Sequence, residues 1–196
     1  MNYEPGTHRR RSIRLAGYDY SQVGAYFVTL CAFRHQSVFG EVADHQIRLN
    51  ELGRIVEETW MTLPNHYDFI VLDAFVVMPN HVHGVVVLIE DQDRAWAAMQ
   101  SPYVEAGLKP APTKAKRHGL PEIVRGFKTF SARRINESRG TRGRTVWQRN
   151  YYERVIRDER ELSRIREYIV HSPQNWETDK DHPLASVSRF IKDFLG

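Results

Sequence analysis

The chain has 196 residues, of which 41% are hydrophobic and 11% aromatic, a composition typical of one folded domain with a proper core rather than of a disordered protein. No apolar run is long enough to cross a bilayer, and the start of the chain lacks the apolar centre of a signal peptide, so we expect a cytoplasmic protein without a membrane partner. A single cysteine excludes an internal disulfide and any multi-cysteine zinc site.

Positive charge is concentrated in one part of the sequence. Residues 109–154 hold 13 Lys or Arg against three acidic residues, whereas the whole chain carries a formal charge of only +4. A second basic cluster, HRRRSIR, lies at 8–14. This distribution is typical of a binding site for a polyanion, although a solvated loop whose arginines bind nothing specific would have the same composition.

The first half of the chain predicts a strand, a helix and two further strands. AYFVTLCAF (25–33) is rich in aromatic and branched residues and predicts a strand. LNELGRIVEETWMTLP (49–64) has apolar residues at helical spacing and Asn50 as a cap, so it predicts a helix with one apolar face. Two strands joined by a tight turn are predicted at 67–78 and 81–90.

The second half predicts two helices and one more strand. Residues 91–119 are rich in Pro, Ala and Lys and predict a flexible insert. LPEIVRGFKTFSARRINES (120–138) predicts a helix, and 141–157 predicts a basic turn followed by a strand. DERELSRIREYIVHSP predicts a third helix that begins with the capping-box pair Asp158 and Glu161.

The resulting order, β-α-β-β-α-β-α, predicts an α+β fold. It matches the ferredoxin-like arrangement of a four-stranded antiparallel sheet with two helices on one face, here followed by a C-terminal helix. We expect one domain over residues 1–196, with a basic N-terminal tail at 1–20 and a C-terminal tail at 177–196. Such a fold hosts many functions and decides none.

Two histidines interrupt the apolar strand at 81–90. Residues two apart on a strand share a face, so His81 and His83 project side by side together with Val85. Neutral imidazole is the commonest side-chain metal ligand, and the pair would form half of a divalent-metal site. The alternative is a pair of histidines that only make hydrogen bonds at a sheet edge. Gly84 leaves the opposite face open to a helix or a substrate backbone.

One tyrosine stands out in the third predicted helix. Tyr168 lies beside the apolar stripe of Leu162, Ile165 and Ile169. It could be a residue at the border of the core with its hydroxyl in water. A phenol near a metal-bound phosphate is also a competent nucleophile, because covalent catalysis divides phosphoryl transfer into two easier steps.

These motifs resemble a known family. MPNHVHGVV (78–86) resembles the HUH histidine motif of the single-tyrosine (Y1) transposases of the IS200/IS605-like superfamily. WQRNYYERVIRDERELSRIREYIVHSPQNW (147–176) resembles the C-terminal region of their REP-associated relatives, and LPEIVRGFKTFSARRIN is similar to the same group. The resemblance runs from about Arg11 to Trp176 and is weakest in the insert.

The resemblance implies a metal-dependent DNA strand transferase. His81 and His83 would bind one divalent ion, Mg²⁺ or Mn²⁺. Tyr168 would attack a phosphodiester in single-stranded DNA, forming a 5′-phosphotyrosine link and releasing a 3′-hydroxyl. Attack on that link by a 3′-hydroxyl would rejoin DNA without ATP.

The third metal ligand departs from the family pattern. Relatives usually carry Gln or Asn four residues after the tyrosine, where this chain has Ser172. Ser172, the neighbouring His171, Gln174 or a water molecule are the candidates for that position.

The resemblance also implies that the DNA is an imperfect hairpin flanked by single strand, as in the REP elements of bacterial genomes. We therefore expect a nucleoid-associated protein that acts as a monomer or a homodimer. Trp147 could stack on bases but is expected to pack on the sheet, and the two tyrosines at 151 and 152 lie too early to be the nucleophile. The residues predicted to contact DNA are Arg9, Arg10, Arg11, Arg125, Lys128, Arg133, Arg134, Arg142, Arg144, Arg149, Tyr151 and Tyr152.

Two other functions fit parts of the sequence. Ser172 is compatible with a protein that has lost the chemistry and only binds DNA hairpins. The two histidines are compatible with a metal hydrolase of small phosphoesters or carbonyls, but that function lacks the usual Asp and Glu ligands and leaves the basic segment unexplained.

Overall fold

A computed structural model describes residues 17–90, 119–179 and 181. Most of the predicted N-terminal tail, the predicted insert, and most of the predicted C-terminal tail lie outside these residues, and Arg9, Arg10 and Arg11 lie there with them. No helix in the described ranges has the length and apolar character that a membrane span requires.

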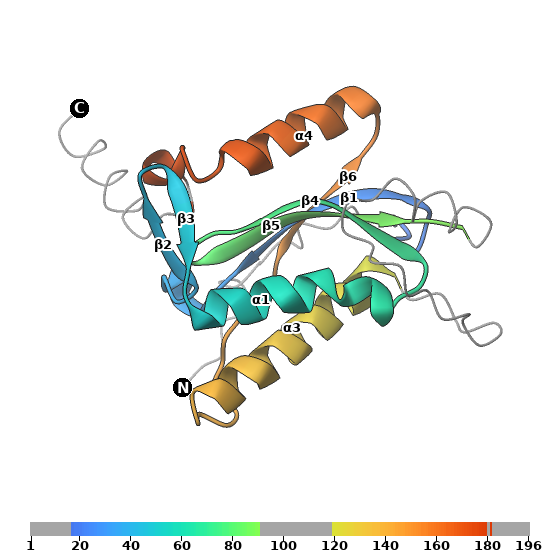
Figure 1. Ribbon diagram of the computed structural model, residues 1–196. Helices are drawn as coiled ribbons and strands as arrows, with labels where there is room; N and C mark the ends of the chain where they lie inside the picture. The colour runs from blue at the N-terminus through green and yellow to red at the C-terminus, as the bar shows by residue number, and fades with distance from the viewer. Residues whose placement is uncertain (1–16, 91–118, 180, 182–196) are drawn as a thin grey trace, which may run out of the picture.

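A four-stranded antiparallel sheet forms the centre of the molecule, in the order β4-β5-β1-β6. Helices α1 and α3 cover one face of the sheet, and α4 lies across the other (Figure 1). The α+β prediction, including the helix placed after the last strand, is confirmed. The bounds of the sheet strands and helices are β1 Gly24–Cys31, α1 Glu51–Met61, β4 Ile70–Val77, β5 His81–Leu88, α3 Leu120–Ser138, β6 Tyr152–Ile156 and α4 Glu159–His171.

The structure adds a second, two-stranded sheet that the predicted order lacks. β2 (Gly40–Ala43) and β3 (Gln46–Leu49) pair antiparallel, joined by a turn at Asp44 and His45. Both turn residues have positive φ, 53° and 60°, as tight hairpin turns require. These strands have only four residues each, too few for the polar and apolar alternation of Gln46–Leu49 to stand out in the sequence.

Several predicted strands are longer than the observed ones. β1 ends at Cys31, and beyond it the pairing continues only at Ala32, whose N–H donates to the carbonyl of Asn80 and which forms an isolated bridge with Trp147. β4 starts only at Ile70, because the preceding residues still belong to a turn. The N–H of Tyr67 donates to the carbonyl of Leu63, the first residue of the 3₁₀ turn η2 (Leu63–Asn65). The last strand keeps only the final residues of the predicted segment.

The larger core lies between the sheet and helices α1 and α3. Gly84 of β5 faces it, and a Cβ on this residue would come within 2.3 Å of the Trp60 ring of α1. The open face expected at Gly84 is therefore filled by a helix. Trp147 is 5% exposed and donates from Nε1 to Ser131 Oγ at 2.9 Å, which confirms that it packs in the core.

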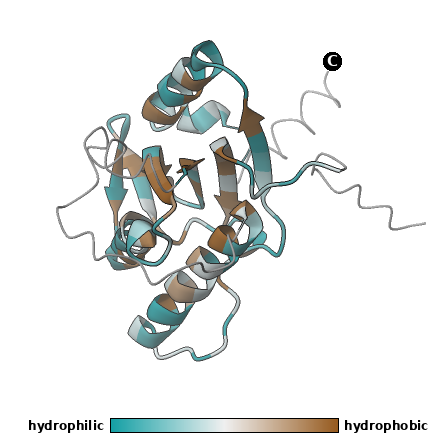
Figure 2. Cartoon of the chain, turned by 90° about the vertical axis from the view of Figure 1, so that its right-hand side faces the viewer, coloured by the Kyte–Doolittle hydropathy of each residue, from teal (hydrophilic) through white to brown (hydrophobic). Residues whose placement is uncertain are grey.

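The smaller core lies on the opposite face, beneath α4. Leu162 and Ile165 of the helix pack around buried Ile169, which contacts sheet residues Phe27 and Val85. Hydrophobic and hydrophilic stretches alternate along the helices of both layers (Figure 2). The hydrophobic periodicity thus explains why α4 lies on the sheet with Tyr168 on its border.

The predicted caps hold α1 and α4 in place. Asn50 Oδ1 accepts from the N–H groups of Leu52 and Gly53 at the start of α1. Asp158 accepts from the N–H of Glu161, as predicted. The return half of the capping box is absent, because the Glu161 carboxylate accepts instead from the N–H of Arg157.

Candidate active site

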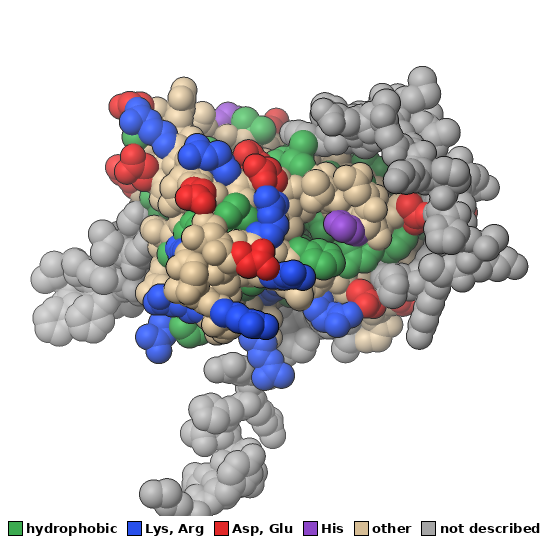
Figure 3. All heavy atoms as spheres, turned by 60° about the horizontal axis from the view of Figure 1, so that its bottom comes forward, with side chains coloured by type: hydrophobic (Ala, Val, Ile, Leu, Met, Phe, Trp, Pro, Cys, Tyr) green, Lys and Arg blue, Asp and Glu red, His purple; other side chains and the backbone are tan. Residues whose placement is uncertain are grey.

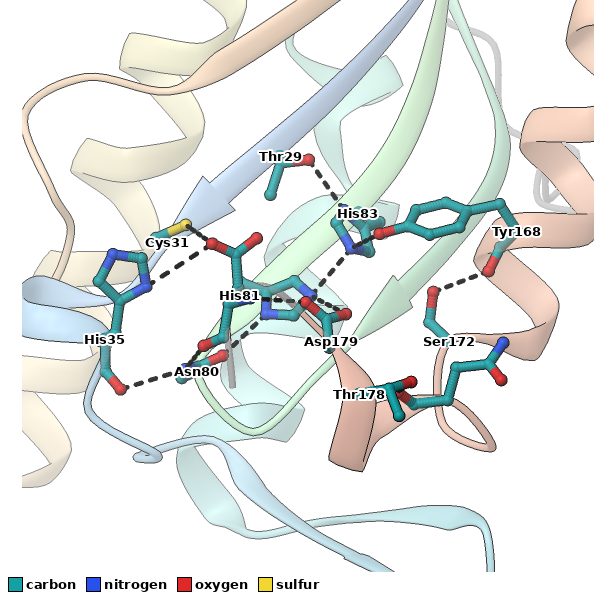
Figure 4. A network of polar contacts seen from close by, with 12 residues as sticks. Thr29, Cys31, His35, Asn80, His81, His83, Tyr168, Ser172, Thr178 and Asp179 are labelled. Atoms are coloured by element: carbon teal, nitrogen blue, oxygen red, sulfur yellow. Dashed lines mark hydrogen bonds and ion pairs between the residues drawn. The ribbon is translucent and has the colours of Figure 1, made fainter. Parts of the chain in front are cut away.

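His81 and His83 lie at the start of β5, on the face covered by α4. Both side chains are fully buried. Their neighbours on β1 are fixed by the register, which places Cys31 opposite His81 and Thr29 opposite His83. Facing residues of an antiparallel pair project to the same side, so these four side chains share one surface of the sheet (Figure 4).

Asn80 fixes the tautomer of His81. The amide nitrogen of Asn80 donates to two carbonyl oxygens, of His35 at 3.1 Å and of Asp181 at 2.6 Å, so its Oδ1 must face His81. This oxygen accepts from Nδ1 of His81 at 2.7 Å. A neutral His81 then has its lone pair on Nε2, the atom needed for a metal ligand.

The two imidazoles meet through their Nε2 atoms, which lie 2.9 Å apart. Nδ1 of His83 lies 2.9 Å from Thr29 Oγ1, on the far side of the ring. Each ring is therefore held by a hydrogen bond at Nδ1 and directs Nε2 to a common point. This is the arrangement in which a pair of histidines holds one cation.

Tyr168 reaches the same point from α4. Its hydroxyl lies 3.0 Å from Nε2 of His83 (Figure 4). The ring packs edge-on against Phe27, with centroids 6.1 Å apart, and 40% of the residue is exposed. Burial, with added repulsion from Asp179 and Asp181, raises the pKa of Tyr168 to about 12. The nucleophile candidate is thus oriented by the protein and still open to solvent.

An ion pair connects α4 to the edge of the sheet. Arg166 donates to both carboxylate oxygens of Asp73 on β4, from Nε at 2.8 Å and from a terminal nitrogen at 2.7 Å. Asp73 lies in a β-bulge between Leu72 and Phe75. Burial raises the pKa of Asp73, but the bonds from Arg166 and the Ala74 amide outweigh it and leave the pKa below its ordinary value. The pair places Tyr168, half a turn further on, above the histidines.

Asp179 is the third residue at this point, and no motif in the sequence predicts it. Its Oδ2 lies 4.0 Å from Nε2 of His81, and its side chain is only 5% exposed. His81, His83 and Asp179 each offer one ligand atom, all within 4.8 Å of one another. Asp179 follows the short turn η4 (Trp176–Thr178), where no periodic pattern marks one acidic residue among its polar neighbours.

The residues predicted as the third metal ligand either bond to backbone carbonyls or are exposed. Ser172 is buried, and its Oγ donates to the carbonyl of Tyr168 at 2.8 Å. His171 is exposed, with Nδ1 2.7 Å from the carbonyl of Glu167. Gln174 is exposed as well. Asp179 is placed better than any of them to complete a site of two nitrogens and one oxygen.

The predicted DNA contacts on α3 are held in ion pairs. Arg125 pairs with Glu122, Arg133 with Glu137, and Arg134 with Glu58 of α1. Figure 3 shows positive and negative side chains interleaved on the side of the molecule that α1 and α3 form. These exposed arginines therefore have carboxylate partners, and their contact with DNA stays a prediction.

Lys128 has a structural role in the same helix. Its Nζ donates to the carbonyls of Gln148 at 2.9 Å and Asn150 at 3.1 Å and lies 5.3 Å from the ring centre of Tyr151. Burial lowers the pKa of Lys128 to about 8. Lys128 thus fixes the segment that leads into β6.

The other predicted arginines are arranged differently. Within the described ranges, Arg142, Arg144 and Arg149 are exposed and make no side-chain ion pair. Arg144 lines a hollow of about 440 Å³ together with Arg34 and Arg139. Tyr152 lies at the β6 side of the active-site face, its ring centre 6.2 Å from that of Phe27.

Comparison with known proteins gives three informative matches. The chain is 38% identical over 182 residues to an uncharacterized Haemophilus influenzae protein, covering 91% of this chain and 96% of that protein. It is 27% identical over 177 residues to a Haemophilus influenzae protein named "Putative REP-associated tyrosine transposase", covering 89% of this chain and 85% of that protein. No family model matches.

A solved structure agrees with this relation. The fold superimposes on that of a REP-associated tyrosine transposase bound to a REP hairpin with a TM-score of 0.51, covering 81% of this chain and 73% of the other, at 15% identity. The chain is thus similar to REP-associated tyrosine transposases over most of its length. The predicted resemblance to this family is confirmed, and so is a fold shared with a solved transposase.

Proposed function

We propose that this relative of the REP-associated tyrosine transposases is a metal-dependent endonuclease and strand transferase of single-stranded DNA. The observation that carries the proposal is that Nε2 of His83 lies 2.9 Å from Nε2 of His81 and 3.0 Å from the Tyr168 hydroxyl, on one face of the sheet. A nucleophile beside a site for a cation is the constellation that phosphoryl transfer needs.

The ligand set fits a hard or borderline divalent ion. Two imidazoles and the Asp179 carboxylate would hold Mg²⁺ or Mn²⁺ and leave coordination positions for phosphate oxygens and water. The ion would neutralise charge that develops on the scissile phosphate. Asn80 and Thr29 keep both rings oriented by their bonds to Nδ1.

In the first step the Tyr168 oxygen attacks the phosphorus and loses its proton to solvent. The bond between phosphorus and the 3′-oxygen breaks, and that oxygen takes up a proton. The product is a 5′-phosphotyrosine link to the downstream strand and a 3′-hydroxyl on the upstream strand. In the second step a 3′-hydroxyl attacks the link and restores Tyr168, so no energy-rich cofactor is consumed.

We infer a DNA partner from the exposed arginines and from the similarity to REP-associated tyrosine transposases. The relative of solved structure is bound to a REP hairpin, and we infer a hairpin with a flanking single strand as the ligand here. Arg142, Arg144 and Arg149 are the described arginines best placed to contact phosphates. This function places the protein on DNA in the cytoplasm, with residues 1–196 acting as one domain.

A single chain holds the complete constellation. Tyr168 is on a helix that packs on the same chain's sheet, and the Arg166–Asp73 pair holds it there. This geometry supports a monomer as the cleaving species, with a homodimer as the alternative.

The test uses hairpin oligonucleotides with randomised flanking single strands, incubated with Mn²⁺ or Mg²⁺ and either wild-type protein or Tyr168→Phe. With label at the 3′ end of the DNA, we expect wild type to give a covalent protein–DNA band on a denaturing gel. With label at the 5′ end, the same reaction should give only a shortened strand. Tyr168→Phe should give neither.

The alternative is a hairpin-binding protein without chemistry, for which Ser172 at the usual ligand position is the supporting observation. It would be established if wild type and Tyr168→Phe both bound the hairpin and neither cleaved it with any metal ion.

A further inference from the structure

A second group of ligand-bearing side chains lies next to the histidine pair. Cys31 is the last residue of β1, and His35 is the last residue of the 3₁₀ turn η1 (Phe33–His35). Asp181 lies two residues after Asp179 in the sequence. Oδ1 of Asp181 lies 3.9 Å from Sγ of Cys31 and 3.8 Å from Nδ1 of His35. The ligand atoms of all three residues lie within 4.8 Å of one another.

These separations are too long for good hydrogen bonds but suit ligands of one ion. An N–H···O bond spans about 2.7–3.2 Å. Metal–ligand distances of about 2.0–2.3 Å in a tetrahedral zinc site place neighbouring ligand atoms about 3.3–3.8 Å apart. The three atoms thus need to move only slightly to surround an ion.

The environment of Asp181 is one that a bound cation would stabilise. Its side chain is 14% exposed, and its Oδ2 atom is buried with no hydrogen-bond partner among the described residues. A buried carboxylate oxygen without a donor is costly. The His35 side chain is 41% exposed, so an ion can reach the group from solvent.

We propose that Cys31, His35 and Asp181 bind a zinc ion at a site separate from the His81 and His83 pair. One thiolate, one imidazole and one carboxylate form a ligand set that zinc takes readily, with water in the fourth position. Binding releases the proton of the Cys31 thiol to solvent.

The zinc site would order the third catalytic ligand. The N–H of Asp181 donates to Oδ1 of Asp179 at 2.7 Å, and Oδ2 of Asp179 faces His81. Asn80 connects the same parts, because its amide binds the carbonyls of His35 and Asp181 and accepts from His81. Fixing Asp181 therefore fixes Asp179. This consequence rests on the proposed function, whereas the zinc site does not.

Cobalt replaces zinc with a spectroscopic signature and provides the test. The metal-free full-length chain is titrated with Co²⁺ while the thiolate-to-cobalt charge-transfer band is recorded in the near ultraviolet. Because Cys31 is the only cysteine, any such band reports this residue alone. We expect a band in wild type that added Zn²⁺ abolishes, and no band in Cys31→Ser.

Three variants identify the remaining ligands. His35→Gln and Asp181→Asn should each weaken cobalt binding, measured by the band, at least about tenfold. His45→Gln, at an exposed histidine of the β2–β3 turn, should leave it unchanged. The double variant His81→Ala/His83→Ala should keep the band. Circular dichroism confirms that each variant is folded.

Two results would overturn the proposal. A wild-type protein without the band does not bind metal through Cys31. A band that is lost in the histidine double variant would assign Cys31 to the catalytic ion instead of a second one. Neither result depends on whether the protein cleaves DNA, so failure of the zinc site and failure of the nuclease function are distinguishable.

Discussion

At the scale of single residues, the site depends on how two imidazole rings are oriented. Asn80 and Thr29 bind the two Nδ1 atoms, and the Nε2 atoms face a shared point that Tyr168 also reaches. The sequence predicted the histidines and the tyrosine because strand alternation and helical periodicity place them on defined faces. It could not predict Asp179, which lies in an irregular segment where position depends on tertiary contacts.

Removing either histidine should separate cleavage from binding. We expect His81→Ala or His83→Ala to abolish cleavage while hairpin affinity stays within about tenfold, or about 1.4 kcal/mol. The reason is that the rings hold a cation and are too deeply buried to contact the hairpin stem. Gel shifts and cleavage assays on the same samples measure both, with His45→Ala as the control. Joint loss of folding and binding would make the histidines structural.

Asp179 should matter for the affinity of the catalytic ion. We expect Asp179→Asn to weaken Mn²⁺ binding by at least about tenfold, as losses at metal sites typically do. Glu177→Gln removes an exposed carboxylate two residues earlier and should have no effect. Titration followed by Mn²⁺ paramagnetic resonance compares the two. Equal Mn²⁺ affinities of Asp179→Asn and wild type would mean that Asp179 is not the third ligand and that Ser172 or water takes this position.

At the scale of elements, the position of α4 determines where Tyr168 lies. The apolar stripe was readable from the sequence and predicts that the helix packs on the sheet. The Arg166–Asp73 pair, which fixes its position along β4, was not readable, because the two residues are 93 positions apart and Asp73 lies in a bulge. The small β2–β3 sheet also escaped prediction, since its strands have only four residues each.

Removing the Arg166–Asp73 pair should weaken the packing of α4 on the sheet. We expect Arg166→Met to lower the free energy of unfolding by about 1 kcal/mol, a modest figure because solvent screens the half-exposed guanidinium. We also expect a larger loss of cleavage rate than of hairpin binding. Arg164→Met, on the exposed side of the same helix, is the matched control. Equal effects of the two substitutions on cleavage would show that the pair does not position Tyr168.

The pair also has a defined pH dependence. Because the folded-state pKa of Asp73 is depressed below 3.8, its stabilisation is complete above that value and is lost as the pH falls further. The stability difference between wild type and Arg166→Met should therefore shrink in acid, as measured by urea unfolding.

At the scale of the whole molecule, charge divides the basic residues into two groups. The arginines of α3 are neutralised by carboxylates, whereas those of the turn before β6 make no side-chain ion pair in the described structure. Composition alone showed a basic segment of 109–154 but could not tell these groups apart. The separation depends on contacts between helices, such as that of Arg134 with Glu58.

The salt dependence of DNA binding should distinguish the groups. Replacing Arg142, Arg144 or Arg149 by Ala should reduce the slope of log affinity against log salt by about 1 for each phosphate that is no longer neutralised. Arg125→Ala and Arg133→Ala should leave the slope nearly unchanged. Fluorescence anisotropy over a salt series measures it. A larger decrease in slope for the α3 arginine variants would show that DNA binds to the face formed by α1 and α3.

The most direct test of the account is to locate the covalent bond. After cleavage in Mn²⁺, the protein–DNA adduct is digested with trypsin and nuclease, and mass spectrometry identifies the peptide that carries the nucleotide. The segments 167–180 and 150–154 separate Tyr168 from Tyr151 and Tyr152, since each follows an arginine. If Tyr168 is the nucleophile, the nucleotide is on 167–180, attached through its 5′-phosphate. A nucleotide on 150–154 would show that Tyr151 or Tyr152 is the nucleophile instead.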